Sequence, residues 1–163
     1  MSLHYIIDGY NVIKQVTFLT GKKLRDGRDG LVRFIEKYRP QGSAKNEVTI
    51  VFDGKAEISS PAIQSSVQVI FSKNETADDK IKRMVESAGN SRQMVIVSDD
   101  KEIMFYCRSL GANVKSVKEF LDSSFAAKNR LKPAEKIEKA ELSSDIADKI
   151  TEDLKKLWLN KEN

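Results

Sequence analysis

Short apolar runs that alternate with helical patterns limit the possible folds of this chain more than any other feature. Runs of four or five consecutive apolar residues are typical of strands covered on both faces, as in parallel sheets. The predicted strands lie within residues 4–8, 47–54, 66–72, 93–100 and 112–117. The first of them ends in Asp-Gly-Tyr-Asn, which the residue types predict to be a turn.

The segments between these runs carry helical spacing. Apolar residues recur at three- and four-residue intervals in 24–38, 77–88 and 101–110, and a capping box at Ser116 and Glu119 opens a further short helix. Strands that alternate with helices predict an α/β fold with a central, mostly parallel sheet flanked by helices.

The length of 163 residues suits one domain, and we place it at 1–126. Residues 127–163 are predicted to form a charged linker followed by a C-terminal amphipathic helix. One cysteine and one histidine argue against disulfides and against a zinc site. No apolar run approaches the roughly 20 residues that span a bilayer, and no signal peptide is visible. We therefore expect a soluble, cytoplasmic protein with no membrane partner.

The charge balance permits nucleic-acid binding without establishing it. Lysine and arginine number 28 against 24 acidic residues, a net charge of +4. Basic residues gather in 22–39, among them Arg25 and Arg28. The chain has no G-x-G-x-x-G and no P-loop motif, so dinucleotide and P-loop nucleotide binding lack support.

Acidic side chains follow four of the predicted strands, near the point where each strand ends. They are Asp8, Asp53, Asp78, Asp79, Asp99 and Asp100. The carboxyl ends of parallel strands lie along one edge of a sheet, where such folds bind ligands, so we expect these side chains to converge. Converging carboxylates repel one another, and their oxygen atoms are ligands that suit Mg²⁺ or Mn²⁺. The pattern predicts a metal site for phosphoryl-transfer chemistry.

Each acid also has an ordinary structural explanation. Asp8 and Asp53 can form turns, and Asp78 can favour a helix N-terminus through the helix dipole. One of the acids at 99–100 can serve as a helix cap. Asn11 can form an Asx turn, orient Asp8 or contact a phosphate. The joint occurrence of acids at strand ends favours the metal site over these separate explanations.

Four motifs occur in an order that resembles the YacP-like NYN domains, part of the PIN-like nuclease group. They are IIDGYNVI (6–13), VFDG (51–54), ETADDKI (75–81) and VSDDKEI (97–103). The likeness covers about residues 4–122, and the tail at 141–159 resembles the C-terminal segment of that family. The resemblance implies a three-layer PIN-like fold with an acidic pocket at the carboxyl edge of its sheet and metal-dependent cleavage of RNA. Some bacterial members are similar to ribosome-associated endoribonucleases.

Carried onto this chain, the resemblance implies a set of site residues. The catalytic set is Asp8, Asn11, Asp53, Asp78 and Asp99. The metal ligands are Asp8, Asp53, Asp78, Asp79 and Asp99, with Asp100 as the alternative to Asp99 if the motif is aligned on Glu102. The resemblance also matches Ser98 to a Ser-Asp pair of the family. Apart from the resemblance, we expect Tyr10 beside Asp8 to stack on a base and the basic residues Arg25, Arg28 and Lys55 to hold the RNA backbone, which makes these four and Ser98 the expected substrate contacts.

Three hypotheses follow. The first is an endoribonuclease that hydrolyses single-stranded RNA, including mRNA on the ribosome, with Mg²⁺ or Mn²⁺. The second is a non-catalytic module that binds RNA or the ribosome, with salt-sensitive binding that EDTA does not affect. The third, a phosphatase of the haloacid dehalogenase type, normally has an Asp-x-Asp motif after the first strand. Here that position reads Asp8-Gly9-Tyr10, so the second acid is absent.

Overall fold

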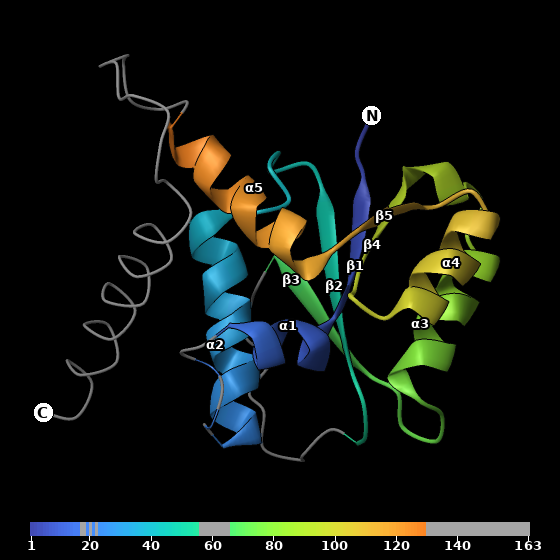
Figure 1. Cartoon of the computed structure of the whole chain (residues 1–163), viewed down its shortest axis with the longest axis horizontal. Helices are drawn as coiled ribbons and strands as arrows, with labels where there is room; N and C mark the ends of the chain where they lie inside the picture. The colour runs from blue at the N-terminus through green and yellow to red at the C-terminus, as the bar shows by residue number, and fades with distance from the viewer. Residues whose placement is uncertain (17–18, 20, 22, 56–65, 130–163) are drawn as a thin grey trace, which may run out of the picture.

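A five-stranded parallel sheet forms the centre of the molecule (Figure 1). The computed structural model describes residues 1–16, 19, 21, 23–55 and 66–129. The strands are β1 (His4–Asp8), β2 (Glu47–Phe52), β3 (Val67–Phe71), β4 (Met94–Val97) and β5 (Asn113–Lys115). They lie in the order β3-β2-β1-β4-β5, and every neighbouring pair is parallel. The predicted α/β fold is confirmed.

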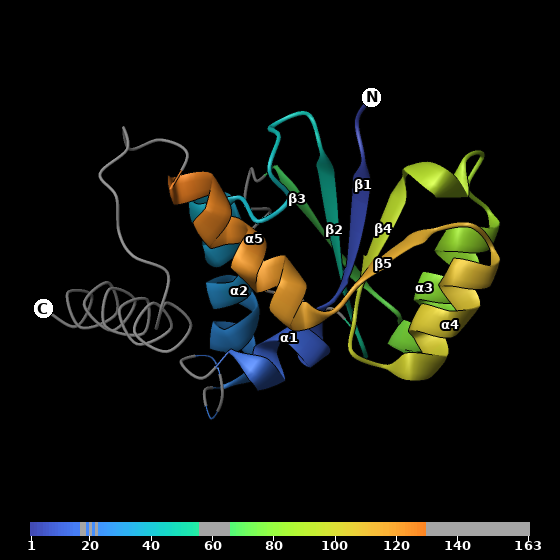
Figure 2. The same cartoon turned by 45° about the horizontal axis from the view of Figure 1, so that its top comes forward.

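Helices cover both faces of this sheet, as Figure 2 shows. One face carries α1 (Gly9–Gln15), α2 (Leu24–Tyr38) and α5 (Val117–Asn129). The other face carries α3 (Ala77–Glu86) and α4 (Lys101–Ser109). A short 3₁₀ helix, η1 (Ser91–Gln93), precedes β4. The result is three layers, with the sheet in the middle.

The two-residue period of the strands divides the core between these layers. In β1, Tyr5 and Ile7 pack with the helices of the α1 face, while Ile6 packs with α3 and α4. Asp8 follows Ile6 by two residues, so the period places it toward the α3 and α4 face at the end of the strand. The core packing thereby selects the face on which the first acid emerges.

Local capping fixes where several helices begin. Thr76 Oγ1 accepts a hydrogen bond from the N–H of Asp79 at 3.1 Å and so caps α3. Ser116 and Glu119 form the predicted capping box at α5, with the Ser116 N–H donating to Glu119 Oε2 at 2.7 Å and the Glu119 N–H donating to Ser116 Oγ at 3.2 Å. These bonds satisfy N–H groups that have no partner inside the helix.

One element differs from the prediction. The Asp-Gly-Tyr-Asn segment is not a simple turn, because α1 begins at Gly9 directly after β1. The last described helix, α5, runs to Asn129, and the domain boundary predicted after residue 126 stays a prediction. The predicted tail helix and the connection at 56–65 lie outside the described residues.

The sheet has a topological switch point between β1 and β4. The chain leaves β1 through α1 and α2 toward β2, then crosses the opposite face through α3 and joins the other side of β1 as β4. The carboxyl ends of β1 and β4 therefore lie side by side, where α/β folds bind their ligands. Within the described part of the chain, no helix is long and apolar enough to cross a membrane.

Candidate active site

Asp8 stands at the switch point with little access to solvent. Its side chain is 8% exposed. Burial raises the pKa of the Asp8 carboxyl, because water no longer stabilises the charged form. Hydrogen bonds from Asn11 lower the pKa of Asp8, whereas the nearby charge of Asp78 raises it. The net shift is upward because burial has the largest effect.

Two polar residues hold Asp8 in place. The backbone N–H of Asn11 donates to Asp8 Oδ1 at 3.4 Å, and the Asn11 amide donates to Asp8 Oδ2 at 3.5 Å. The hydroxyl of Ser98, which is fully buried, donates to Asp8 Oδ2 at 3.4 Å and accepts from the Asn11 amide at 3.4 Å. Asn11 thus orients Asp8, one of the roles predicted for it. The Ser98 hydroxyl positions the same carboxylate across the switch point.

Asp78 brings a second carboxylate toward Asp8 from the first turn of α3. Burial raises its pKa, and the charge of Asp100 is the next largest cause in the same direction. Lys82 lowers the pKa of Asp78, but not enough to reverse the shift. The charge of Asp78 thus acts on Asp8, and the charge of Asp100 acts on Asp78, as do those of Asp79 and Glu102. We refer to Asp8, Asp78 and Asp100 as the carboxylate chain.

The two acids after β4 lie in different surroundings. Asp100 is half-buried, caps α4 through hydrogen bonds from the N–H groups of Glu102 and Ile103, and donates its own N–H to Ser98 Oγ at 3.1 Å. Asp99 is exposed, and its Oδ1 accepts from the N–H of Val117 at 2.9 Å. Its Oδ2 accepts from the side chain of Gln15. Asp99 thus joins the end of α1 to the start of α5, while Asp100 belongs to the carboxylate chain.

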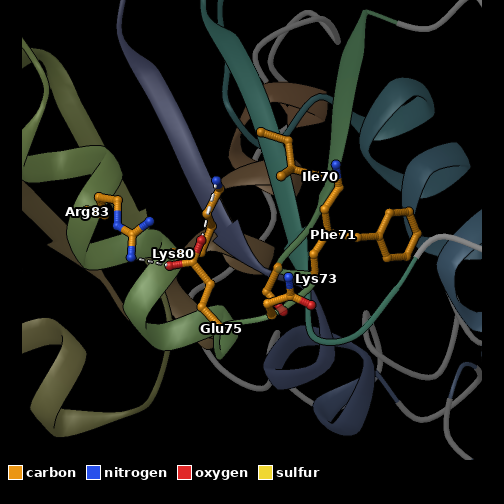
Figure 3. Close-up of a pocket in the computed structure, with 8 residues that line it drawn as sticks. Ile70, Phe71, Lys73, Glu75, Lys80 and Arg83 are labelled. Carbon is orange, nitrogen blue, oxygen red and sulfur yellow. Dashed lines mark ion pairs between the residues drawn. The ribbon is translucent and has the colours of Figure 1, made fainter.

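A groove with a volume of about 430 Å³ lies between the end of β3 and α3 (Figure 3). None of the residues of the carboxylate chain lines it. Lys73, Lys80 and Arg83 line it together with Glu75. The acidic site and this basic groove are therefore two separate features that share α3.

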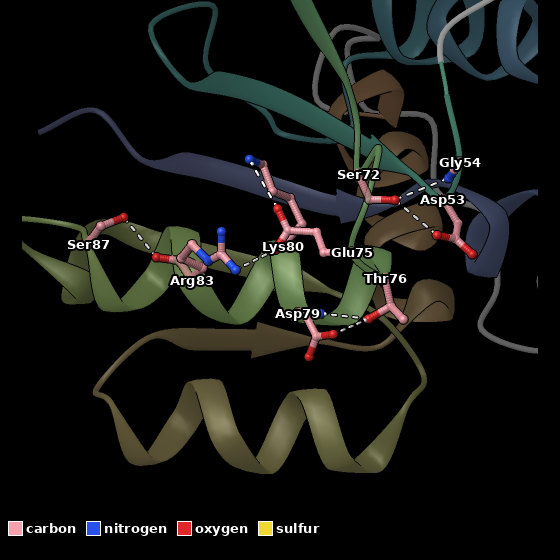
Figure 4. A network of polar contacts seen from close by, with 9 residues as sticks. All are labelled: Asp53, Gly54, Ser72, Glu75, Thr76, Asp79, Lys80, Arg83 and Ser87. Carbon is pink, nitrogen blue, oxygen red and sulfur yellow. Dashed lines mark hydrogen bonds and ion pairs between the residues drawn. The ribbon is translucent and has the colours of Figure 1, made fainter.

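Asp53 and Asp79 have partners of their own (Figure 4). Asp53 is exposed after β2 and accepts a hydrogen bond from the Ser72 hydroxyl at 2.9 Å, while that hydroxyl accepts from the N–H of Gly54 at 3.1 Å. Asp79 accepts from the Thr76 hydroxyl at 2.8 Å as part of the cap of α3. Of the predicted metal ligands, Asp8, Asp79 and Asp100 interact electrostatically with Asp78. Asp53 and Asp99 instead accept hydrogen bonds from Ser72 and Val117, which lie on other segments.

The acids fit a hard divalent cation in their chemistry, but they are not a closed metal site. Within the described ranges, no three His, Cys, Asp or Glu side chains are grouped closely enough to hold an ion. The donors at the switch point are carboxylate oxygens, the amide of Asn11 and the hydroxyl of Ser98, which are ligands of Mg²⁺ and Mn²⁺ rather than of softer metals. A cation there would offset the two effects that raise the pKa values of Asp8 and Asp78, which are burial first and repulsion from neighbouring carboxylates second.

Arg28 is enclosed by aromatic rings beside the site. Its guanidinium carbon lies 5.7 Å from the ring centre of Tyr10, 5.6 Å from that of Phe52 and 5.0 Å from that of Phe71. The Tyr10 hydroxyl accepts hydrogen bonds from Arg28 Nε at 3.1 Å and from Nη2. The predicted base-stacking ring and the predicted backbone-binding cation are thus bonded to each other. Arg25 and Lys55, the other predicted RNA contacts, are exposed.

Sequence reasoning missed the residues that position the acids. Ser72 and Gln15 were not predicted, and neither were the rings of Phe52 and Phe71 beside Arg28. For Ser72, the feature that could have revealed it is its position: the register pairs Phe52 with Phe71, so Asp53 and Ser72, the next residue of each strand, are neighbours. That feature becomes visible only once the order of the strands is known.

Comparisons with known proteins agree with this fold and its motifs. The chain is similar to the crystal structure of Rae1 (YacP) from Bacillus subtilis, at 26% identity and a TM-score of 0.63 over 99% of this chain and 90% of that one. It is also similar to the W164L mutant of Rae1, at 28% identity and a TM-score of 0.61 over 80% of this chain and 79% of that one. No curated protein gave a match. The YacP-like NYN domain profile matches residues 5–160, so the chain belongs to the YacP-like NYN domain family.

Proposed function

We propose that this chain is a metal-dependent endoribonuclease that hydrolyses single-stranded RNA. The observation that carries the proposal is the buried Asp8 carboxylate, held by Asn11 and Ser98 at the switch point within electrostatic reach of Asp78. Membership of the YacP-like NYN family supports the same chemistry. From the likeness to ribosome-associated members, we further propose that the RNA includes mRNA on the ribosome and that the enzyme acts in the cytoplasm.

In this proposal, Asp8, Asp78 and Asp100 hold one or two Mg²⁺ or Mn²⁺ ions, directly or through water. When bound, such an ion supplies the Lewis-acid charge that phosphodiester hydrolysis requires. Asn11 keeps the Asp8 carboxylate oriented through two hydrogen bonds. Ser98 links that carboxylate to the N–H of Asp100, so the ends of β1 and β4 move together. Asp53, Asp79 and Asp99 stay predicted ligands. Each already accepts a hydrogen bond, from Ser72, Thr76 and Val117 respectively, and keeps lone pairs that a metal could use.

Cleavage of an end-labelled single-stranded RNA tests the proposal. Wild-type protein is incubated with Mn²⁺, with Mg²⁺ and with EDTA, beside Asp8→Asn and Asp78→Asn. Asp122→Asn is the matched control, because Asp122 is an exposed acid on α5. We expect metal-dependent cutting that Asp8→Asn reduces about a hundredfold or more, equivalent to several kcal/mol of transition-state stabilisation. Full activity in folded Asp8→Asn would falsify the site assignment.

One observation favours a second candidate function. The groove between β3 and α3 is lined by three cations and one acid, which suits a non-catalytic RNA- or ribosome-binding module. Such a module binds RNA in a salt-sensitive manner and ignores EDTA. RNA binding without cutting by wild-type protein, in either metal and on isolated ribosomes as well as on free RNA, would favour this function.

A further inference from the structure

The basic groove between β3 and α3 has a defined lining (Figure 3). Its walls come from the end of β3 with the following turn, which carries Lys73, and from α3, which carries Lys80 and Arg83. The ring of Phe71 points away from α3, so the groove is not an aromatic pocket. Cationic side chains define its chemistry.

The charge of this groove is not cancelled within the described part of the protein. Glu75 is the single acid of the lining, against the three cations Lys73, Lys80 and Arg83, which leaves an excess of two positive charges. Glu75 Oε1 lies 3.5 Å from Lys80 Nζ, and Glu75 Oε2 lies 2.9 Å from Arg83 Nη2. The Glu75 side chain is only 17% exposed, so it holds the two cations from beneath while Arg83 stays 66% exposed.

Lys73 contributes the least constrained charge. It is exposed, and among the described residues no carboxylate pairs with its ammonium group. Its backbone has φ of 64°, in the left-handed region that lysine seldom adopts, and its N–H donates to the carbonyl of Gly54 at 2.8 Å. The turn after β3 therefore fixes the point from which this side chain leaves the backbone.

The groove and the acidic site lie on opposite flanks of the same helix. At about 100° per residue, Lys80 and Arg83 are about 200° and 140° around α3 from Asp78. Lys82, on the Asp78 flank, is bonded to Glu102 of α4 at 2.7 Å and does not line the groove. Both flanks begin at the N-terminal end of α3, at the carboxyl edge of the sheet. An extended chain that crosses this end of α3 meets carboxylates on one side and the groove cations on the other, two of which are paired with Glu75.

We propose that this groove binds the sugar–phosphate backbone of single-stranded RNA beside the nucleotide that occupies the acidic site. The identity of the ligand rests on the proposed function. Lys73 and Arg83 contact phosphate oxygens, with Lys80 beside them, and these contacts carry no base preference. The groove thereby gives affinity and direction to the strand, and the carboxylate site acts on it.

RNA binding in EDTA tests this inference without requiring cleavage. The affinity of a fluorescent 12-nucleotide RNA is measured by anisotropy over a range of salt for wild type and for Lys73→Gln/Arg83→Gln. The matched control is Lys45→Gln/Arg92→Gln, which removes one lysine and one arginine from exposed positions at the amino edge of the sheet. Loss of two phosphate contacts should lower the slope of log K against log salt by about 1.4. We expect Kd to rise about tenfold at about 100 mM salt, and the control to stay within about twofold.

Every outcome decides the inference. Equal Kd and equal slope in the two double variants overturn it, as does wild-type protein that binds no RNA. Binding of a decaglutamate peptide is measured with the same variants. If loss of the groove cations weakens peptide binding but not RNA binding, the groove binds an acidic protein segment and the inference is overturned. Lys73→Gln alone, at an exposed side chain, should show about half of the slope change without disturbing the fold. Groove-dependent binding without cleavage in metal would leave this inference standing and remove the nuclease, so the two failures are distinguishable.

Discussion

Replacing Gly9 by alanine tests why a glycine stands between the buried acid and the helix that follows it. A Cβ at Gly9 would lie 2.3 Å from Phe52 Cε1, 2.5 Å from Phe52 Cδ1 and 2.9 Å from Ile50 Cγ2. Carbon atoms in contact normally stay about 3.5–4.0 Å apart, so the methyl group is more than about 1 Å too close to the ring. Phe52 is fully buried, and its ring centre is 5.1 Å from that of Tyr10. The ring can move only by disturbing Tyr10 and Arg28.

The magnitude follows from two opposing effects. Overpacking a core costs about 1–3 kcal/mol, and three contacts below 3.0 Å with rigid or buried partners place Gly9→Ala at the upper end. Alanine also restricts the unfolded chain, which stabilises by about 0.4–1 kcal/mol. We expect a net loss of about 2 kcal/mol in the free energy of unfolding. For a chain of this size the melting temperature should fall by about 4–8 °C.

Urea unfolding followed by far-UV circular dichroism measures this change, and two other glycines give matched controls. Gly27 lies in α2, where a Cβ would lie 3.6 Å from Ile13 Cδ1, an ordinary contact, so Gly27→Ala should gain about 0.5–1 kcal/mol. Nothing lies within 4 Å of a Cβ at Gly89, so Gly89→Ala should change stability by less than about 0.5 kcal/mol. Gly9→Ala as stable as wild type, with Gly27→Ala showing its gain, would refute the reasoning.

Three further predictions concern single groups. The pKa of Asp8 is raised in the folded state, so ionisation of this carboxyl at rising pH destabilises the fold. Asp8→Asn, which cannot ionise, should therefore melt at a higher temperature than wild type at pH 7 but not at pH 3. An equal difference in melting temperature at both pH values would contradict this. Arg28→Met should lower the free energy of unfolding, measured in urea, by about 1–2 kcal/mol. A double-mutant cycle with Tyr10→Phe should show a coupling free energy of about 1 kcal/mol between the two side chains. A coupling of zero would rule out an energetic contact between them. Cys107 is fully buried and burial raises its pKa to about 11, so it should react with a thiol reagent only after unfolding, and rapid labelling of native protein would disprove the packing.

The sheet could be predicted from the sequence because each buried strand has the sequence of a short apolar run. The α1 helix could not, because it has only seven residues and begins with Gly-Tyr-Asn after Asp8, residue types that also form turns. Such a short helix depends on tertiary contacts, here on packing against the sheet and α2. Asp8 begins this helix as its cap and also stands at the switch point, so the turn-like residues serve both purposes.

Part of the candidate site also follows from topology alone. Strand order and the two-residue period bring Asp8 and Ser98 together, and the start of α3 brings Asp78 toward them. The directions of Asp53 and Asp99 do not follow, because each lies in a loop beyond its strand and bonds to a residue from a distant segment. The sequence does not reveal those hydrogen-bond partners, so the prediction from strand ends brought all the acids together in a single site.

The choice between Asp99 and Asp100 is the sharpest case. Sequence alignment favours Asp99, yet Asp99 bonds to the N–H of Val117 and to Gln15, while the charge of Asp100 acts on Asp78. Asparagine caps helices about as well as aspartate, so Asp100→Asn should keep the cap of α4 and lose only the charge.

We therefore expect Asp100→Asn to lower metal-dependent RNA cleavage about a hundredfold with stability within about 1 kcal/mol of wild type. Asp99→Asn should cleave as wild type does, because its Oδ1 can still accept from Val117. Asp99→Ala removes that acceptor and should cost about 0.5–2 kcal/mol in the free energy of unfolding, with cleavage retained below the melting temperature. The reverse pattern, with cleavage lost in Asp99→Asn and kept in Asp100→Asn, would mean that Asp99 leaves Val117 to bind the metal and that the carboxylate chain through Asp100 is only structural.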